Sequence, residues 1–102
     1  MISGLPDNTH RFTKPNYRYN IYGFDFYCVN HDIEFIRQQL QQVRHIENAW
    51  FQLKSDYNST FVAEYKQEAN EAAKEGTARR AANIQLRHNV EQLLKNRLKR
   101  AY

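Results

Sequence analysis

Cysteine, proline and glycine are scarce in this chain of 102 residues, which contains one cysteine, two prolines and three glycines. Because Cys28 stands alone, an internal disulfide is excluded, as is typical of proteins in a reducing compartment. The three separated glycines form neither a phosphate-binding loop nor a dinucleotide-binding turn. No run approaches the ~20 apolar residues that cross a bilayer, and the first residues lack the pattern of a signal peptide. We therefore expect a cytoplasmic protein, or a virion protein if the chain is a phage component, with no membrane association.

Motifs for metal binding and catalysis are also missing. The four histidines never occur four residues apart, and Cys28 and His31 supply only two of the four ligands of a structural zinc site. Cys28 lies among apolar residues, where burial would raise its pKa and make it a poor nucleophile. Asp25, Asp32 and Glu34 are better explained as partners of a helix N-terminus than as an acid–base pair. The sequence predicts no enzyme, no metal, no cofactor and no small-molecule substrate.

Aromatic residues, by contrast, are concentrated near the N-terminus, where seven of them precede residue 28. Residues 1–16 hold both prolines and are expected to form an extended arm. Residues 17–29 alternate apolar and polar side chains on both sides of Gly23, which predicts strand structure with a bulge or a tight hairpin at the glycine. Two strands alone are marginal in water, so we expect this segment to pack on a helix or on another chain.

Two helical segments are predicted after the strands. Apolar residues recur at spacings of three and four over residues 31–54, namely Ile33, Ile36, Leu40, Val43, Ile46, Trp50 and Leu53. The polar cluster over residues 55–60 predicts a turn. Residues 60–100 contain no proline and are rich in strong helix formers, so they predict one long helix, continuous or bent at Gly76. The expected fold is a single domain, mainly α, in which a helical hairpin with a long C-terminal helix follows an extended aromatic arm or small β-hairpin.

Two parts of this fold are candidates for contact with other protein chains. The aromatic segment is richer in large side chains than two short helices can cover, and a stripe of small residues on the long helix would allow close helix packing. The predicted protein-interface residues are Tyr17, Tyr19, Ile21, Phe24, Phe26, Tyr65, Ala69, Ala72 and Gly76.

The C-terminal quarter of the chain is basic. Residues 79–102 hold seven Lys/Arg against one Glu, whereas residues 1–78 hold eight against ten Asp/Glu. The candidate residues for binding nucleic acid or an acidic partner are Arg80, Arg87, Lys95 and Lys99. Glu91 lies four residues from both Arg87 and Lys95, so the same face also fits an ordinary solvated ladder of ion pairs.

These features favour a non-enzymatic adaptor or structural subunit of a larger protein assembly, for example a phage or virion component, that acts through protein–protein contacts. Two alternatives stay open. One is a small basic nucleic-acid-binding or regulatory protein that uses residues 79–100. The other is a small inhibitor that docks on a larger enzyme through an acidic stripe on the long helix, formed by Glu64, Glu68, Glu71 and Glu75.

Overall fold

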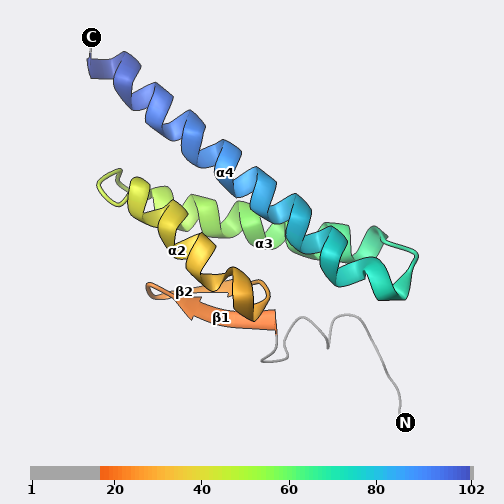
Figure 1. Ribbon diagram of the computed structural model, residues 1–102. Helices are drawn as coiled ribbons and strands as arrows, with labels where there is room; N and C mark the ends of the chain where they lie inside the picture. Colours follow the sequence, from red (N-terminus) through yellow and green to blue (C-terminus); the bar gives the residue numbers. More distant parts are fainter. Residues whose placement is uncertain (1–16, 102) are drawn as a thin grey trace.

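A computed structural model describes the chain over residues 17–101, with side chains described for residues 17–96. The predicted arm, residues 1–16, lies outside this part. The fold is mainly α, with two strands followed by three helices. The order is β1 (Arg18–Ile21), β2 (Phe24–Tyr27), a 3-10 turn (Asn30–Asp32), α2 (Ile33–Gln42), α3 (Ala49–Gln67), a second 3-10 turn (Glu71–Ala73) and α4 (Lys74–Ala101). The predicted class is confirmed: α3 and α4 form a helical hairpin, and a small β-hairpin lies beside it (Figure 1).

The strands pair antiparallel, with Ile21 opposite Phe24 and Tyr19 opposite Phe26. Because side chains alternate across a strand, these four lie on one face, and Ile21 and Phe26 are fully buried against the helices. The connection is the two-residue turn Tyr22–Gly23, in which both residues have positive φ, 53° and 91°. Positive φ at both central positions is the signature of the type I′ turn that suits the twist of a hairpin. The predicted strand structure is therefore confirmed, and of the two possibilities at Gly23 the structure has the tight hairpin.

The prediction of one helix over residues 31–54 is wrong, because α2 ends at Gln42 and α3 begins at Ala49. The chain reverses between them, and Asn48 adopts a left-handed conformation with φ 65°. Asn tolerates this region better than most residues. At the C-terminal end of α2 the Leu40 carbonyl accepts two hydrogen bonds, one of 2.7 Å from the indole Nε1 of Trp50 and one of 3.1 Å from the Val43 N–H. The apolar spacing continues across the break because both segments pack on the same core.

The turn predicted over residues 55–60 is wrong as well, since α3 runs through it. Its polar side chains bind across elements instead of forming a turn: Thr60 donates to the Gln85 side chain at 2.7 Å, and Asn58 binds the β-hairpin. Buried apolar residues recur at every fourth position of α3 and form a stripe that favours one continuous helix. They are Ala49, Leu53, Tyr57, Phe61 and Tyr65.

The helix is interrupted after Gln67 and not at Gly76. The prediction of one helix over residues 60–100 is therefore also wrong. Asn70 starts the new segment by accepting a hydrogen bond of 3.0 Å from the Ala72 amide. The Lys74 ammonium donates to the carbonyls of Tyr65 at 3.0 Å and Glu68 at 2.5 Å, which satisfies the C-terminal end of α3. Gly76 lies in the first turn of α4.

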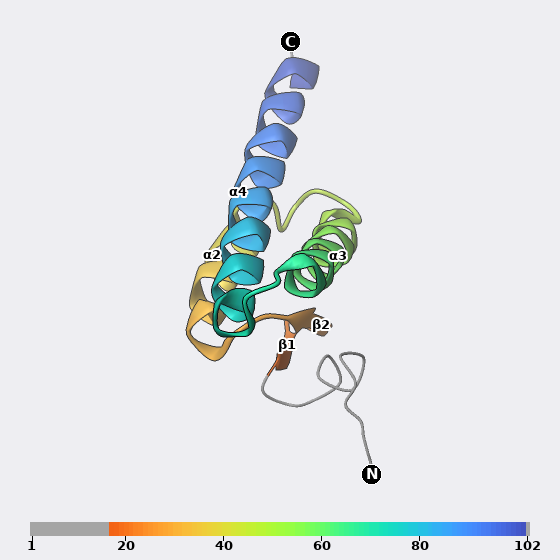
Figure 2. The same ribbon diagram turned by 90° about the vertical axis from the view of Figure 1, so that its right-hand side faces the viewer.

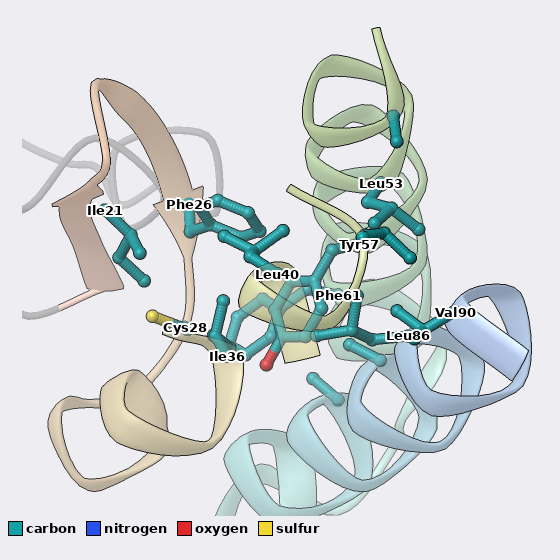
Figure 3. Close-up of a cluster of buried hydrophobic side chains, with 14 of the residues drawn as sticks. Ile21, Phe26, Cys28, Ile36, Leu40, Leu53, Tyr57, Phe61, Leu86 and Val90 are labelled. Carbon is teal, nitrogen blue, oxygen red and sulfur yellow. The ribbon is translucent and has the colours of Figure 1, made fainter. Parts of the chain in front are cut away.

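The core lies where the hairpin, α2, α3 and α4 meet (Figures 1 and 2). Figure 3 shows the hairpin side chains Ile21 and Phe26 directed toward Leu40 of α2 and the aromatic residues of α3. The stripe Ala78, Ala82, Leu86 and Val90 of α4 completes the cluster. The first residues of this stripe are small and the later ones larger, which brings the start of α4 close to α3.

Candidate functional site

A buried polar network joins the start of α2 to α4. The Asp32 carboxylate, 4% exposed, accepts hydrogen bonds from Arg79 Nε at 2.8 Å and Arg79 Nη2 at 2.6 Å. Asn83 donates to the same carboxylate at 3.1 Å and accepts a hydrogen bond of 2.6 Å from the Tyr57 hydroxyl. Burial alone would raise the pKa of Asp32, but the hydrogen bonds from Arg79 and Asn83 and the charge of Arg79 lower it overall. Asp32 is therefore an ionised structural anchor, and both of its carboxylate oxygens accept hydrogen bonds.

Cys28 lies close enough to this network for the Asp32 charge to act on its thiol. Its thiol is fully buried, and burial, with a further contribution from the Asp32 charge, raises its pKa to about 12. A thiol with this pKa is protonated at neutral pH and is a weak nucleophile. The described residues contain no group of three or more potential metal ligands.

The predicted aromatic interface of the hairpin is largely used inside the chain. Ile21, Phe26 and Tyr65 belong to the core, with 0%, 0% and 2% exposure, so in this fold their side chains pack within the chain instead of forming the expected surface. The cause is the continuity of α3, which places aromatic rings under the hairpin where a turn was expected. Phe26 packs edge-on against Tyr57, with ring centroids 5.7 Å apart.

The remaining aromatic residues of the hairpin lie at the edge of the same core. Tyr17 contacts the rings of Phe61 and Tyr65, and its hydroxyl donates to Glu75 at 3.1 Å. Tyr19 and Phe24 are half-buried. Of these residues, Phe24 borders a hollow on the surface.

Asn58 covers the outer edge of β2. Its amide oxygen accepts from the Tyr27 backbone N–H at 2.8 Å, and its amide nitrogen donates to the Asp25 carbonyl at 2.9 Å. One side chain thus occupies the backbone donor and acceptor that an added strand would use. Sequence reasoning missed this contact, because nothing local indicates it.

The predicted stripe of small residues does not form one helix face. Ala69 and Ala72 are exposed in the connection between α3 and α4, and Gly76 follows in α4. The connection between α3 and α4 also divides the predicted acidic stripe. Glu68 is engaged within the chain, accepting from Thr77 and from the Asn70 amide, and Glu75 accepts from Tyr17. The four glutamates therefore do not share one continuous helix, and docking on a larger enzyme stays a prediction.

The basic residues of α4 remain accessible. Arg80, Arg87 and Lys95 are exposed, and the Lys99 side chain lies outside the described residues. Glu91 is exposed and forms no ion pair with Arg87 or Lys95 among the described side chains, so the predicted ladder is not formed. The Arg87 guanidinium lies 6.0 Å from the centre of the Phe35 ring.

A group of apolar residues, the aromatic patch, lies where the hairpin turn meets the turn between α2 and α3. Two of its members, Tyr22 and Phe51, are exposed, and the other three, Phe24, Ile46 and Trp50, are half-buried against the core. Tyr22 is 41% exposed and stacks on Trp50 with ring centroids 5.0 Å apart, and Phe51 is 56% exposed. Figure 1 shows the two turns at the same end of the molecule.

The aromatic patch surrounds a hollow of about 260 Å³. This hollow is lined by Phe24, Arg44, Ile46, Glu47, Asn48, Trp50 and Phe51. Lys54 lies 4.8 Å from the centre of the Phe51 ring. The only two non-glycine residues with positive φ in the described part of the chain, Tyr22 and Asn48, both lie at this patch. A bulky residue in this conformation is strained, and such strain is concentrated at functional sites.

No helix in the described part of the chain has the length and apolar character needed to cross a membrane. Comparison of the chain with protein-family models, with curated proteins and with solved structures finds no match.

Proposed function

We propose that this protein is a non-enzymatic adaptor or structural subunit that binds another protein chain through the aromatic patch. The observation that carries the proposal is the exposure of Tyr22 and Phe51 beside a hollow lined by Phe24, Ile46 and Trp50. Aromatic anchors around a pocket are typical of the centre of a protein interface. The proposed setting is the cytoplasm or a virion, which the single reduced Cys28 supports.

The identity of the residues in the patch supports binding more than folding. A type I′ turn favours Asn or Gly at the position of Tyr22, because these residues adopt positive φ at low cost. The chain instead has a tyrosine there that leaves much of its ring exposed. Phe51 faces away from the buried stripe of α3 and contacts Lys54. Exposing apolar side chains to water costs free energy. The fold does not require an apolar side chain at either position.

Replacing the exposed aromatic residues should therefore remove binding while the fold persists. We expect the double variant Tyr22→Asn/Phe51→Glu to lose the protein partner that the wild-type chain retains in affinity purification from its native cells. The matched control is Ile84→Glu, because Ile84 is 61% exposed on α4 and lies outside the patch. A photo-crosslinking residue at position 51, but not at position 84, should attach to the same partner. Retention of the partner by the double variant would contradict the proposal.

A second candidate function, binding of nucleic acid by α4, is favoured by one observation. Arg80, Arg87 and Lys95 are exposed and form no ion pair with the side chains that the structure describes, so their charges are available to phosphates. Binding of this kind should weaken steeply as salt increases, because each phosphate contact releases counterions.

This candidate predicts that replacing Arg80, Arg87, Lys95 and Lys99 together by Gln abolishes binding to a 20-base-pair duplex and leaves the helical circular dichroism unchanged. Fluorescence anisotropy from about 50 to 200 mM salt measures the effect. Absence of salt-sensitive binding by the wild-type chain would exclude the candidate.

A further inference from the structure

The outer edge of β1 carries a row of backbone groups that point away from the hairpin. The Cys28 N–H donates to the Tyr17 carbonyl at 3.0 Å, so these two residues form a hydrogen-bonded pair of the antiparallel ladder. Hydrogen-bonded pairs alternate with non-hydrogen-bonded pairs along such a ladder. Arg18 and Asn20 therefore direct their N–H and C=O groups away from β2. This edge presents two donors and two acceptors to a further strand.

The outer edge of β2 is covered, whereas the outer edge of β1 is open. The Asn58 side chain of α3 binds the Tyr27 N–H and the Asp25 carbonyl. On β1, the outward groups of Arg18 and Asn20 form no hydrogen bond with any residue that the structure describes, and both side chains are exposed. Figures 1 and 2 both show β1 on the side of the hairpin away from α3. An open edge of this kind is a template for one further strand.

The β1 edge is complementary to a second copy of itself. Two β1 strands that pair antiparallel about Tyr19 place Arg18 of each copy opposite Asn20 of the other, so four backbone hydrogen bonds form and no like charges meet. Pairing centred on Arg18 would place two guanidinium groups opposite each other, which is unfavourable. Pairing centred on Asn20 would place Arg18 opposite Tyr22, which lies in the turn with positive φ. Charge and strand length therefore select the register centred on Tyr19.

A second copy, unlike a strand from another protein, also closes the open edge. A foreign strand bound to β1 would expose its own outer edge in turn. In a second copy, the far side of β1 is already paired with β2. The combined sheet has four strands in the order β2–β1–β1–β2, and the Asn58 side chain of each copy covers one of its two outer edges. The assembly is thus complete at two copies, as in other isologous two-fold contacts.

We propose that this chain forms a two-fold symmetric dimer through the outer edge of β1. The backbone of Arg18 in each copy exchanges two hydrogen bonds with Asn20 of the other copy. The two Tyr19 residues face each other across the axis as a non-hydrogen-bonded pair, with Cα atoms about 4.5 Å apart. Their half-buried rings meet at the edge of the core, and a cross-strand aromatic pair of this kind stabilises a sheet. The dimer does not rest on the proposed function of the aromatic patch.

Sedimentation velocity of the full-length protein over a wide concentration range tests the dimer. We expect the sedimentation coefficient to rise with concentration from that of a monomer to that of a dimer and no further, because the outer edges of the four-stranded sheet are covered. A monomer at every concentration, or growth beyond two copies, would overturn the proposal.

A proline at the edge separates the backbone contact from the side chain that carries it. Asn20→Pro removes an outward N–H at an edge position where a strand tolerates proline, so we expect the dissociation constant of the dimer to rise by about tenfold or more. The matched control is Asn20→Ala, which loses the same side chain but keeps the N–H. It should change the dissociation constant less than about threefold. Equal effects of the two variants would contradict pairing through the backbone.

Cysteine cross-linking reports the register directly. Tyr19→Cys places two thiols across the axis at a Cα separation of about 4.5 Å, within the range of a disulfide. Asn20→Cys places them roughly 8 Å apart, beyond that range. We expect mild oxidation to link Tyr19→Cys into covalent dimers much faster than Asn20→Cys, although Asn20 is the more exposed residue. Cys28 is fully buried and is the same in both variants. No cross-link through position 19, or faster linkage through position 20, would overturn the proposal.

Two further measurements on folded protein complete the test. Amide hydrogen exchange followed by NMR should show the N–H groups of Arg18 and Asn20 becoming protected as the concentration of the wild-type chain rises. Protection that does not change with concentration would contradict the dimer. Phe51→Ala should dimerise as the wild type does, because Phe51 lies on α3 and not at the β1 edge. Failure of the aromatic patch and failure of the dimer are therefore distinguishable.

Discussion

Replacing Arg79 by methionine is expected to lower the free energy of unfolding at pH 7 by about 3–5 kcal/mol. The reason is the asymmetry of the ion pair. The Asp32 side chain is 6% exposed and the Arg79 side chain is 34% exposed, so loss of Arg79 leaves a buried carboxylate without its cation. Asn83 alone then remains as a donor to it. Urea denaturation followed by circular dichroism measures the loss, since a domain of this size is expected to unfold in one step.

Acidification should change the free energy of unfolding of the wild-type chain and of Arg79→Met in opposite directions. In the wild-type chain the pKa of Asp32 is lowered on folding, so its contribution to stability is present at neutral pH. That contribution is lost as the pH falls below the ordinary value of an aspartate, about 3.9, through the folded value. In Arg79→Met, the hydrogen bonds and the charge of Arg79 no longer oppose the effect of burial. Burial therefore raises the pKa of Asp32 in this variant. The folded state then binds the proton more tightly than the unfolded state, so acidification from pH 7 to about 4.5 should recover stability.

A double variant provides the control for this explanation. Asp32→Asn/Arg79→Met removes both charges and should recover most of the stability lost by Arg79→Met, because no buried charge is left unpaired. Arg79→Met with wild-type stability at pH 7, or with a stability that falls steadily on acidification, would show that the pair is not the anchor described here.

The β-hairpin was predictable from the sequence because its signal is local. Apolar and polar residues alternate on both sides of Gly23, which indicated two strand segments and left a bulge or a tight hairpin as the two possibilities at the glycine. The helix boundaries were not predictable in this way. Asn48 precedes the second helix in a left-handed conformation, and the Trp50 indole donates to the Leu40 carbonyl near the end of the first helix, ten residues earlier in the chain. Neither contact changes the apolar spacing from which the helix was inferred.

The polar residues of α3 misled the prediction for a related reason. Asp56, Asn58 and Thr60 have the composition of a turn, yet each binds a side chain or backbone group of another element or of its own helix. Asp32 and Arg79 are 47 residues apart, and nothing near either residue in the sequence indicates the other. Tertiary contacts of this kind determine the structure without leaving a local pattern.

One part of the aromatic patch did have a signal in the sequence. The apolar spacing of residues 31–54 includes Trp50 and Leu53 but not Phe51, which falls off the predicted buried face. A phenylalanine outside such a face is either exposed or covered by a partner. The contribution of Tyr22 could not be predicted from the sequence. Its exposure depends on the hairpin turn, and its stacking on Trp50 depends on the break in the helix before Trp50.

The same substitution at two positions of α3 should separate the core from this surface. Phe61 is fully buried, contacts Tyr17 and Tyr65, and lies ten residues after Phe51, which is 56% exposed on the same helix. Phe61→Ala removes buried apolar area and leaves a cavity, so we expect a loss of about 3–5 kcal/mol in the free energy of unfolding. Phe51→Ala removes mainly solvated surface and the contact with Lys54, so we expect a loss of less than about 1 kcal/mol.

Both variants are compared with the wild-type chain by urea denaturation and by retention of the protein partner. Below the unfolding transition, Phe61→Ala should keep its partner, because the aromatic patch lies elsewhere in the fold. Phe51→Ala should be stable and bind its partner weakly. A Phe51→Ala variant that loses as much stability as Phe61→Ala would place Phe51 in the core and would remove the main support for the aromatic patch as an interface. If both variants instead retain wild-type stability, the position of α3 relative to the hairpin is wrong, because the ring of Phe61 would then have no buried contacts to lose.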